Sequence, residues 1–262
     1  MFRTMRIYRR SLGAHFRSLL EYEADFWVLI VAGAMFNALN LLFLSAVFAH
    51  VPALNGWSYA EAVLLMGVWS VIGGLSPLFF EGVWRLSWMV NQGTLDYPLV
   101  RPAPVTVQVF SSGIGLHGVG DIVTGGAMLG WALFHVDVDW TPLTVVIGLV
   151  LLASAATIHL SIIAITNAAT FWISGPHPFL AIAVHTFEDM IKYPLTIYGA
   201  GIRAVYTFVV PFAFVTFFPV SWLLDRSAGW VGLLGPLVAA YCVWLARTVF
   251  RRGLRRYDSS GH

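Results

Sequence analysis

Six stretches of the chain run for about 20 residues or more with almost no charged side chain. They are approximately Phe26 to Ala49, Tyr59 to Phe80, Val105 to Phe134, Leu143 to Ser174, Arg203 to Leu224 and Trp230 to Phe250. A helix needs roughly 20 apolar residues to cross the hydrocarbon core of a bilayer. Strands of a membrane barrel would instead alternate between apolar and polar positions, which these runs do not. The sequence therefore predicts an all-α integral membrane protein with six transmembrane helices in one domain, residues 1–262.

The overall composition excludes the common soluble classes. Hydrophobic residues make up 58% of the 262 positions and charged residues 11%, whereas a soluble domain carries about a quarter charged residues. A formal net charge of +2 is too balanced for a nucleic-acid-binding protein. The single cysteine, Cys242, excludes an internal disulfide and a cysteine-rich metal site, so we expect no metal in this chain.

Basic residues gather at both ends of the chain. Arg3, Arg6, Arg9, Arg10 and Arg17 precede the first apolar run, and Arg247, Arg251, Arg252, Arg255 and Arg256 end or follow the last. Because cytoplasmic segments carry an excess of Lys and Arg, both termini are predicted to be cytoplasmic, in a multi-pass protein of the cell's inner (plasma) membrane. With six spans, the connections 81–104 and 175–202 are also expected on the cytoplasmic side.

The first 25 residues predict an interfacial helix. Apolar side chains recur at steps of three and four residues, at Met5, Tyr8, Leu12, Phe16 and Leu19. Such a stripe is typical of an amphipathic helix lying on membrane lipid. A basic anchor that only sets the topology is the alternative.

Motifs for catalysis are missing from this sequence. The only lysine, Lys192, follows Ile191, so the Gly-Lys pair of an ATP-binding Walker A loop is not present. Gly113, Gly115 and Gly118 match a dinucleotide fingerprint, but they fall inside an apolar run without a preceding strand. Together with Gly120, Gly125, Gly126 and Gly130 they favour close helix packing, with Gly126 and Gly130 forming a GxxxG pair. We expect no enzyme and no cofactor in this chain.

Asp121 is the one carboxylate deep inside an apolar run. A charged side chain at that depth raises the free energy of membrane insertion by at least about 2.5 kcal/mol unless it faces protein or water. We expect Asp121 either to line a polar translocation path or to bond to a neighbouring helix. With His117 it also supports a second function class, a proton- or cation-coupled secondary transporter.

The connection 81–104 predicts a docking surface. Val83, Trp84, Trp88 and Val90 suit one short amphipathic helix ended by Gly93. Three prolines, Pro98, Pro102 and Pro104, then predict an extended approach to the third span. A loop that only skims the membrane is the alternative.

The connection 175–202 repeats this pattern on a smaller scale. Its apolar side is formed by Phe179, Ile182, Phe187 and Met190. Its polar side is formed by His185, Glu188, Asp189 and Lys192. We expect a second amphipathic cytoplasmic segment.

The run from Gly93 to Pro102, GTLDYPLVRP, resembles the segment between spans two and three of type-2 ABC (ABC-2) export permeases. More narrowly, it is similar to small six-span subunits that pair with a separately encoded ATPase. The resemblance extends to Tyr193-Pro194, to Pro211 and Pro219, and to the arginine-rich ending from Gly253 to Gly261.

This resemblance implies a half-transporter: two identical or similar permease subunits on a cytosolic ABC ATPase dimer, which binds ATP and Mg. The first 25 residues would be the elbow helix, and the stretch from Pro211 to Asp225 would be a broken outer region. The residues that would couple to the ATPase are Trp84, Arg85, Trp88, Asp96, Tyr97, Arg101, Glu188, Asp189 and Lys192. A secondary transporter and a membrane-embedded enzyme are the alternatives, and the apolar spans favour a lipid-like or amphipathic cargo.

Overall fold

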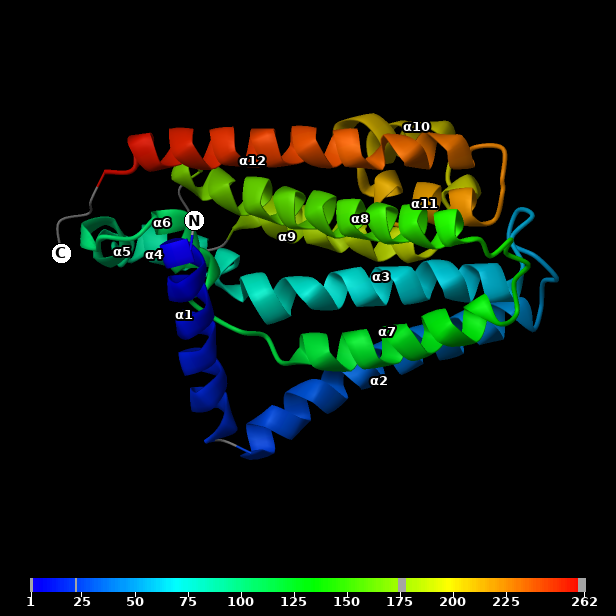
Figure 1. Cartoon of the computed structure of the whole chain (residues 1–262), viewed down its shortest axis with the longest axis horizontal. Coiled ribbons are helices and arrows are strands. Elements are labelled where there is room, and N and C mark those ends of the chain that lie inside the picture. The colour runs from blue at the N-terminus through cyan, green and yellow to red at the C-terminus, as the bar shows by residue number, and fades with distance from the viewer. Residues whose placement is uncertain (1, 22, 174–177, 259–262) are drawn as a thin grey trace.

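A computed structural model describes residues 2–21, 23–173 and 178–258. Within these residues the regular elements are all helices, and a single bridge joins Leu54 to Trp57. Figure 1 shows the long helices lying side by side as a bundle, with short helices gathered at one end. The all-α prediction is confirmed.

The main helices are α1 (Phe2–Leu20), α2 (Glu23–Phe48), α3 (Tyr59–Phe80), α4 (Leu86–Asn91), α5 (Asp96–Val100), α6 (Val105–Phe110), α7 (His117–Leu133), α8 (Pro142–Ala168), α9 (Phe179–Glu188), α10 (Ala200–Ala204), α11 (Phe217–Leu223) and α12 (Gly235–Arg256). Short 3-10 turns cover Glu81–Val83, Ala169–Phe171, Asp189–Lys192, Leu195–Ile197, Phe212–Phe214 and Gly229–Leu234, and Val205–Val209 form a π-helical turn.

The bundle has two different ends. One end, called here the α4 end, holds α4, α5 and α6 and the last turns of α12 (Figure 1). The other, called the Trp57 end, holds the loops 49–58, 134–141 and 224–228 (Figure 1). Arg226 and Gly56 meet at the Trp57 end, where the guanidinium donates a 2.9 Å hydrogen bond to the Gly56 carbonyl.

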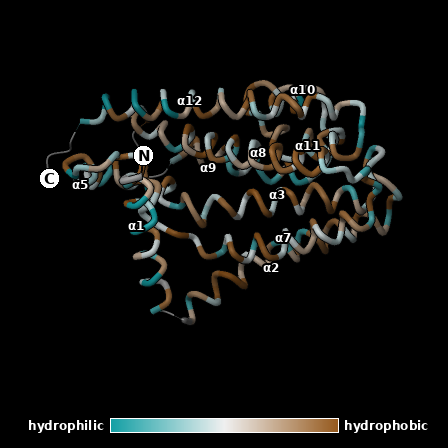
Figure 2. The backbone as a smooth tube through the Cα atoms, viewed as in Figure 1, coloured by the Kyte–Doolittle hydropathy of each residue, from teal (hydrophilic) through white to brown (hydrophobic). Residues whose placement is uncertain are grey.

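Four helical stretches among the described residues are long and apolar enough to cross a membrane. They are Ala24–Phe48, Tyr59–Asn91, Pro142–Phe171 and Gly229–Arg256. A fifth candidate is the helix pair Ala200–Val209 and Phe212–Leu223, which is bent by 77°. Figure 2 shows apolar residues along the long helices and polar residues along α1 and towards the tip of α12. The chain is thus built as a multi-pass membrane protein, while the number six stays a prediction.

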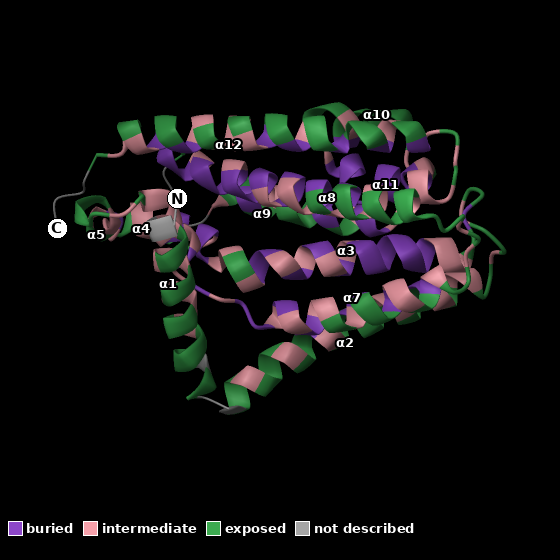
Figure 3. Cartoon of the chain, in the orientation of Figure 1, coloured by how far each residue is buried: buried purple, intermediate pink, exposed green. Residues whose placement is uncertain are grey.

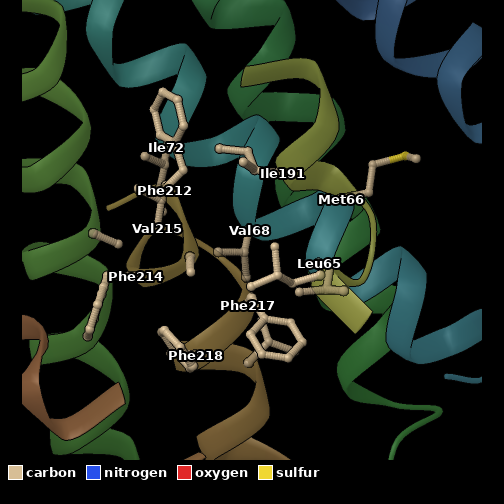
Figure 4. Close-up of a cluster of buried hydrophobic side chains, with 14 of the residues drawn as sticks. Leu65, Met66, Val68, Ile72, Ile191, Phe212, Phe214, Val215, Phe217 and Phe218 are labelled. Atoms are coloured by element: carbon tan, nitrogen blue, oxygen red, sulfur yellow. The ribbon is translucent and has the colours of Figure 1, made fainter. Parts of the chain in front are cut away.

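Helix α3 is the centre of the bundle. Its residues 62–68 are all buried, so no face of this stretch meets solvent or lipid (Figure 3). A helix that is apolar all round is expected to be enclosed in this way. In Figure 4 side chains of α3, including Leu65 and Ile72, pack against Phe212 and Phe217 of the bent pair and against Ile191.

Glycines bring α7 into close contact with its neighbours. A Cβ on Gly125 would lie 2.6 Å from Cβ of Ser70 in α3, and one on Gly120 would overlap the carbonyl oxygen of Ile30 in α2. Small residues allow this approach in membrane bundles. A Cβ added to Gly126 or Gly130 would have no atom within 4 Å, so their predicted GxxxG contact is not formed within the described chain.

The predicted third span, 105–134, is not one helix. Helix α6 ends at Phe110, and residues 111–116 form a turn before α7 begins at His117. Gly82 fits so closely against the Val109 carbonyl that α6 is held beside the end of α3. The turn is fixed by the amide of Gly115, which donates to the Pro77 carbonyl at 2.8 Å.

The predicted connection 175–202 does not stay at one end of the bundle over its described residues, 178–202, and for these residues the prediction is wrong. His185 lies near the α4 end, with its ring 5.2 Å from Trp84. Eleven positions later, at the Trp57 end, the Thr196 carbonyl accepts a 2.6 Å hydrogen bond from Asn55. The segment therefore runs alongside α3 and α8 from one end of the bundle to the other (Figure 1). This course is possible because its charged side chains Glu188 and Lys192 have partners within the protein.

The stretch 200–223 is interrupted as its prolines predict. Pro211 follows the π-helical turn, where a proline ring removes a backbone donor and ends the helix. Tyr206 donates to the Phe187 carbonyl at 2.9 Å, and Thr216 donates to the Ile191 carbonyl at 2.7 Å. Both halves of the bent pair therefore lie against the segment that contains α9, and no straight helix forms here.

Helix α1 forms as predicted and lies steeply across the bundle near its α4 end (Figure 1). Tyr8 donates to the Phe79 carbonyl, and Ser11 donates to the Ser111 carbonyl at 2.9 Å. Burial raises the pKa of Tyr8 to about 12. Met5 and Phe16 stay exposed, as an interfacial helix requires. The Leu19 side chain and residues 259–261 of the arginine-rich ending lie outside the described residues.

Arg226 ties three segments together at the Trp57 end. Its guanidinium bonds Glu61 at 2.7 Å and lies 4.1 Å from the ring centre of Trp57. We expect Arg226→Ala to lower the free energy of unfolding by about 1–2 kcal/mol, and Arg226→Lys by less, because lysine keeps the charge but not the planar fork. Thermal unfolding in detergent checks this, with Arg203→Ala on the exposed side of α10 as control. Equal midpoints for all variants would contradict it.

Candidate functional site

The α4 end carries an ordered and partly apolar surface. After α3, the chain turns through α4, is reversed at Gly93, which has a φ of +68°, and continues as α5. Leu86 and Leu95 are buried against Phe171 and Phe250 and anchor this segment. These contacts fix α4 and α5 in place, while the side chains on their outer faces do not pack against the bundle.

The predicted coupling residues divide between this surface and the interior. Trp88 (58% exposed), Tyr97 and Arg101 lie on the outside of the segment. Arg85 donates to the Ser112 carbonyl at 3.1 Å and braces the turn before α7. Trp84 points inward and lines a cavity inside the bundle.

Asp96 lies at the start of α5 and interacts with the C-terminal tail. Burial, reinforced by the Asp96 carboxylate, raises the pKa of the Tyr257 hydroxyl. The predicted extended run after Gly93 is wrong at its start, because Pro98 sits in the first turn of α5, where a proline is tolerated. Gln108 then secures Pro98 and Ala103 by donating to both carbonyls at 2.9 Å.

A groove of about 760 Å³ separates this segment from α1. Arg10 and His15 of α1 line one side, and Trp88, Tyr97 and Arg101 line the other. The walls combine aromatic rings with positive charge. This surface is suited to bind another protein, since Trp, Tyr and Arg are the residues that dominate protein interfaces.

The remaining predicted coupling residues lie away from the α4 surface. Glu188 is 1% exposed and accepts a 2.8 Å hydrogen bond from Nδ1 of His185. Lys192 donates to Asp189 at 3.0 Å and to Asn40 of α2 at 2.8 Å. Glu188 of this helix faces the bundle, whereas the apolar side chains Phe179, Ile182 and Phe187 are exposed, the reverse of the arrangement expected on a water-facing loop.

Asp121 joins three helices through hydrogen bonds. Asn37 of α2 donates from Nδ2 to Oδ1 of Asp121 at 2.7 Å, and Ser70 of α3 donates to Oδ1 of Asn37 at 2.7 Å. The expected bond to a neighbouring helix is thus present. Asp121 also lines a cavity of about 550 Å³ between α2, α3, α7, α8 and α9. His117 lines the same cavity.

No metal site accompanies this polar interior: in residues 2–21, 23–173 and 178–258, no three His, Cys, Asp or Glu side chains are placed to hold an ion. Asp121 is held by the amide of Asn37, and Glu188 is held by the imidazole of His185.

The family model for ABC-2 family transporter proteins matches residues 34–261. The chain belongs to the ABC-2 family. No curated protein and no solved structure matches it closely enough to add a relative. As an ABC-2 permease, the chain is the membrane component of an ABC transporter and not itself the catalyst of ATP hydrolysis. Permeases of this family usually work with an ATPase component.

Sequence reasoning missed two parts of the permease interior. Asn37 was not singled out, although an amide in an apolar run also needs a hydrogen-bond partner on another helix, and this partner is Asp121. His159 is the second residue, and its neighbours Glu188 and Trp69 come from other helices. The signal in both cases is a polar residue within an apolar run.

Proposed function

We propose that this chain is the permease subunit of an ATP-driven ABC export transporter. Two permease subunits, identical or similar, form the translocation path, and Asp121 lines it. A dimer of cytosolic ABC ATPases binds ATP and Mg and docks on the α4 end. Family membership supports the permease role, and the exposed surface of Trp88, Tyr97 and Arg101 is the observation that carries the docking.

The distribution of charge supports a cytoplasmic α4 end in the inner (plasma) membrane. Basic side chains of α1 and of the last turns of α12 gather there, as cytoplasmic segments require. In this topology the fifth of six crossings is formed by residues 179–197, and the bent pair 200–223 enters and leaves from the Trp57 end. Both termini are then cytoplasmic.

Co-purification tests this function. The tagged chain is expressed with the ATPase encoded beside it, isolated in mild detergent, and assayed for subunit stoichiometry and ATP hydrolysis. We expect Trp88→Ala and Arg101→Ala each to weaken ATPase binding by about 30-fold or more, because truncating an interface Trp or Arg costs about 2 kcal/mol or more. Trp140→Ala is the matched control, since Trp140 is similarly exposed but lies at the Trp57 end.

A chain that purifies alone, without nucleotide-dependent activity, would overturn the proposal. It would favour the secondary transporter that uses Asp121, and transport would then stop with a proton ionophore and persist without ATP. Equal loss of the ATPase from the Trp140→Ala protein would show that the α4 surface is not the docking site.

A further inference from the structure

The cavity between α2, α3, α7, α8 and α9 is lined by more carboxylates than Lys or Arg side chains pair with. Four carboxylates line it: Glu81, Asp121, Glu188 and Asp189. Asp189 is paired with Lys192 at 3.0 Å. Glu81 lies under the electrostatic influence of Arg85. Asp121 and Glu188 form no ion pair with Lys or Arg within the part of the chain that the structure describes: Asp121 accepts from the neutral amide of Asn37, and Glu188 contacts only imidazoles, His185 at 2.8 Å and His159 at 3.4 Å.

An unsatisfied imidazole lies in the wall of the same cavity. His159 is 2% exposed, and neither ring nitrogen has a hydrogen-bond partner among the described residues. Its Nε2 is 3.4 Å from Oε2 of Glu188 but not in hydrogen-bond geometry. Buried polar groups are nearly always satisfied, so an imidazole of this kind in a cavity wall needs a partner from the cavity, either a water molecule or a polar group of a ligand. A neutral imidazole nitrogen would accept a hydrogen bond from a ligand N–H.

Aromatic rings form much of the remaining wall. Phe36, Trp69 and Trp84 line the cavity, and Trp69 packs edge-on against His159 at 5.1 Å between ring centres. The ring of Phe36 already faces a cation, because the Lys192 ammonium lies 5.5 Å from its centre. Rings of this kind bind organic cations through their faces, most strongly where water is excluded.

We propose that this cavity binds an amphipathic organic cation, whose charged group lies between Asp121 and Glu188 and whose apolar body packs on Phe36 and Trp69. A volume of about 550 Å³ falls within the range of small-molecule sites. A protonated amine would in addition satisfy His159. The role of this cation as the cargo rests on the proposed export function, whereas its binding does not.

Two probes of the same shape and opposite charge test the proposal. The full chain in lipid nanodiscs, without nucleotide, is titrated with tetraphenylphosphonium and with tetraphenylborate, and empty nanodiscs give the background. We expect saturable binding of the phosphonium, one per chain, and none of the borate. Asp121→Asn and Glu188→Gln should each weaken phosphonium binding by about tenfold or more, as the loss of one charged interaction implies.

The two substitutions remove charge while keeping the acceptor oxygens. An asparagine at 121 can still accept from Asn37, and a glutamine at 188 can still accept from His185. Asp137→Asn, on the exposed loop at the Trp57 end, is the control and should bind like the unaltered chain. Equal binding of both tetraphenyl ions, or phosphonium binding unchanged in both variants, would overturn the inference.

ATPase retention, measured on the same preparations, separates the two proposals. A complex that retains its ATPase but does not bind the phosphonium contradicts the cavity and leaves the export permease standing. A chain that binds the phosphonium through Asp121 and Glu188 but retains no ATPase supports the cavity and contradicts the proposed function.

Discussion

Alanine at Gly125 is expected to destabilise the bundle, whereas alanine at the next residue is not. The Cβ added at Gly125 would lie 2.6 Å from Cβ of Ser70 and 2.8 Å from the amide nitrogen of Val71, so α7 and α3 must separate. Overpacking of this kind costs about 1–3 kcal/mol. Gly126 has no atom within 4 Å of the added Cβ, and its replacement gains up to about 1 kcal/mol in helix propensity.

The comparison needs only thermal unfolding of the two variants in the same detergent. Because both carry one Gly→Ala change in the same helix, their difference isolates the contact with α3. Destabilisation of both to the same degree would contradict the assignment of Gly125 to the helix interface and would place a further contact, such as one with a second subunit, on Gly126.

Replacing Asn37 with leucine should lower the free energy of unfolding by about 2–4 kcal/mol. The change removes the donor to Asp121 and the acceptor for Ser70 at once, and leaves a carboxyl group and a hydroxyl group without these partners in the interior. Denaturation of the single and double variants of Asn37 and Asp121 measures it. We expect the double variant to lose less than the sum of the two single losses, by about 1 kcal/mol or more.

Thr124→Val is the control for this cycle. Thr124 also lies on α7, but its hydroxyl bonds only the carbonyls of its own helix at Gly120 and Asp121. We expect its loss to be small and to add independently to that of Asn37→Leu. Strict additivity of the Asn37 and Asp121 changes would show that the two side chains do not act together.

Local hydropathy predicted those helices whose own residues are apolar enough to lie in a membrane. The runs near α2, α3, α8 and α12 are predominantly apolar, and each forms a long helix. The segment of α9 escaped this test because its charges count against a membrane position. In the structure Lys192 donates to Asn40 of α2, and Glu188 lies 3.4 Å from His159 of α8, so partners distant in sequence offset a cost that a single-segment pattern cannot include.

Part of the candidate site was predictable because a pattern within one segment indicated it. Trp88, Tyr97 and Arg101 lie on the surface that the amphipathic pattern of residues 81–104 indicated. The interior cavity was not predictable, since it draws its walls from five helices and depends on their register. Which glycine of α7 meets α3 is likewise a property of rotation about the helix axis, and Gly125 and Gly126 are equivalent until that rotation is known.

The contacts of Arg226 have a mechanical consequence. They fasten one extremity of the molecule through Glu61 and Trp57, while α3 extends 22 residues, roughly 33 Å, to the opposite extremity. The turn Glu81–Val83 connects α3 directly to α4. A force on Trp88 is therefore transmitted along α3, whose other end is fixed by Arg226. If the ATPase docks as proposed, a displacement of the α4 surface would move the chain most near Trp84 and least at the Trp57 end.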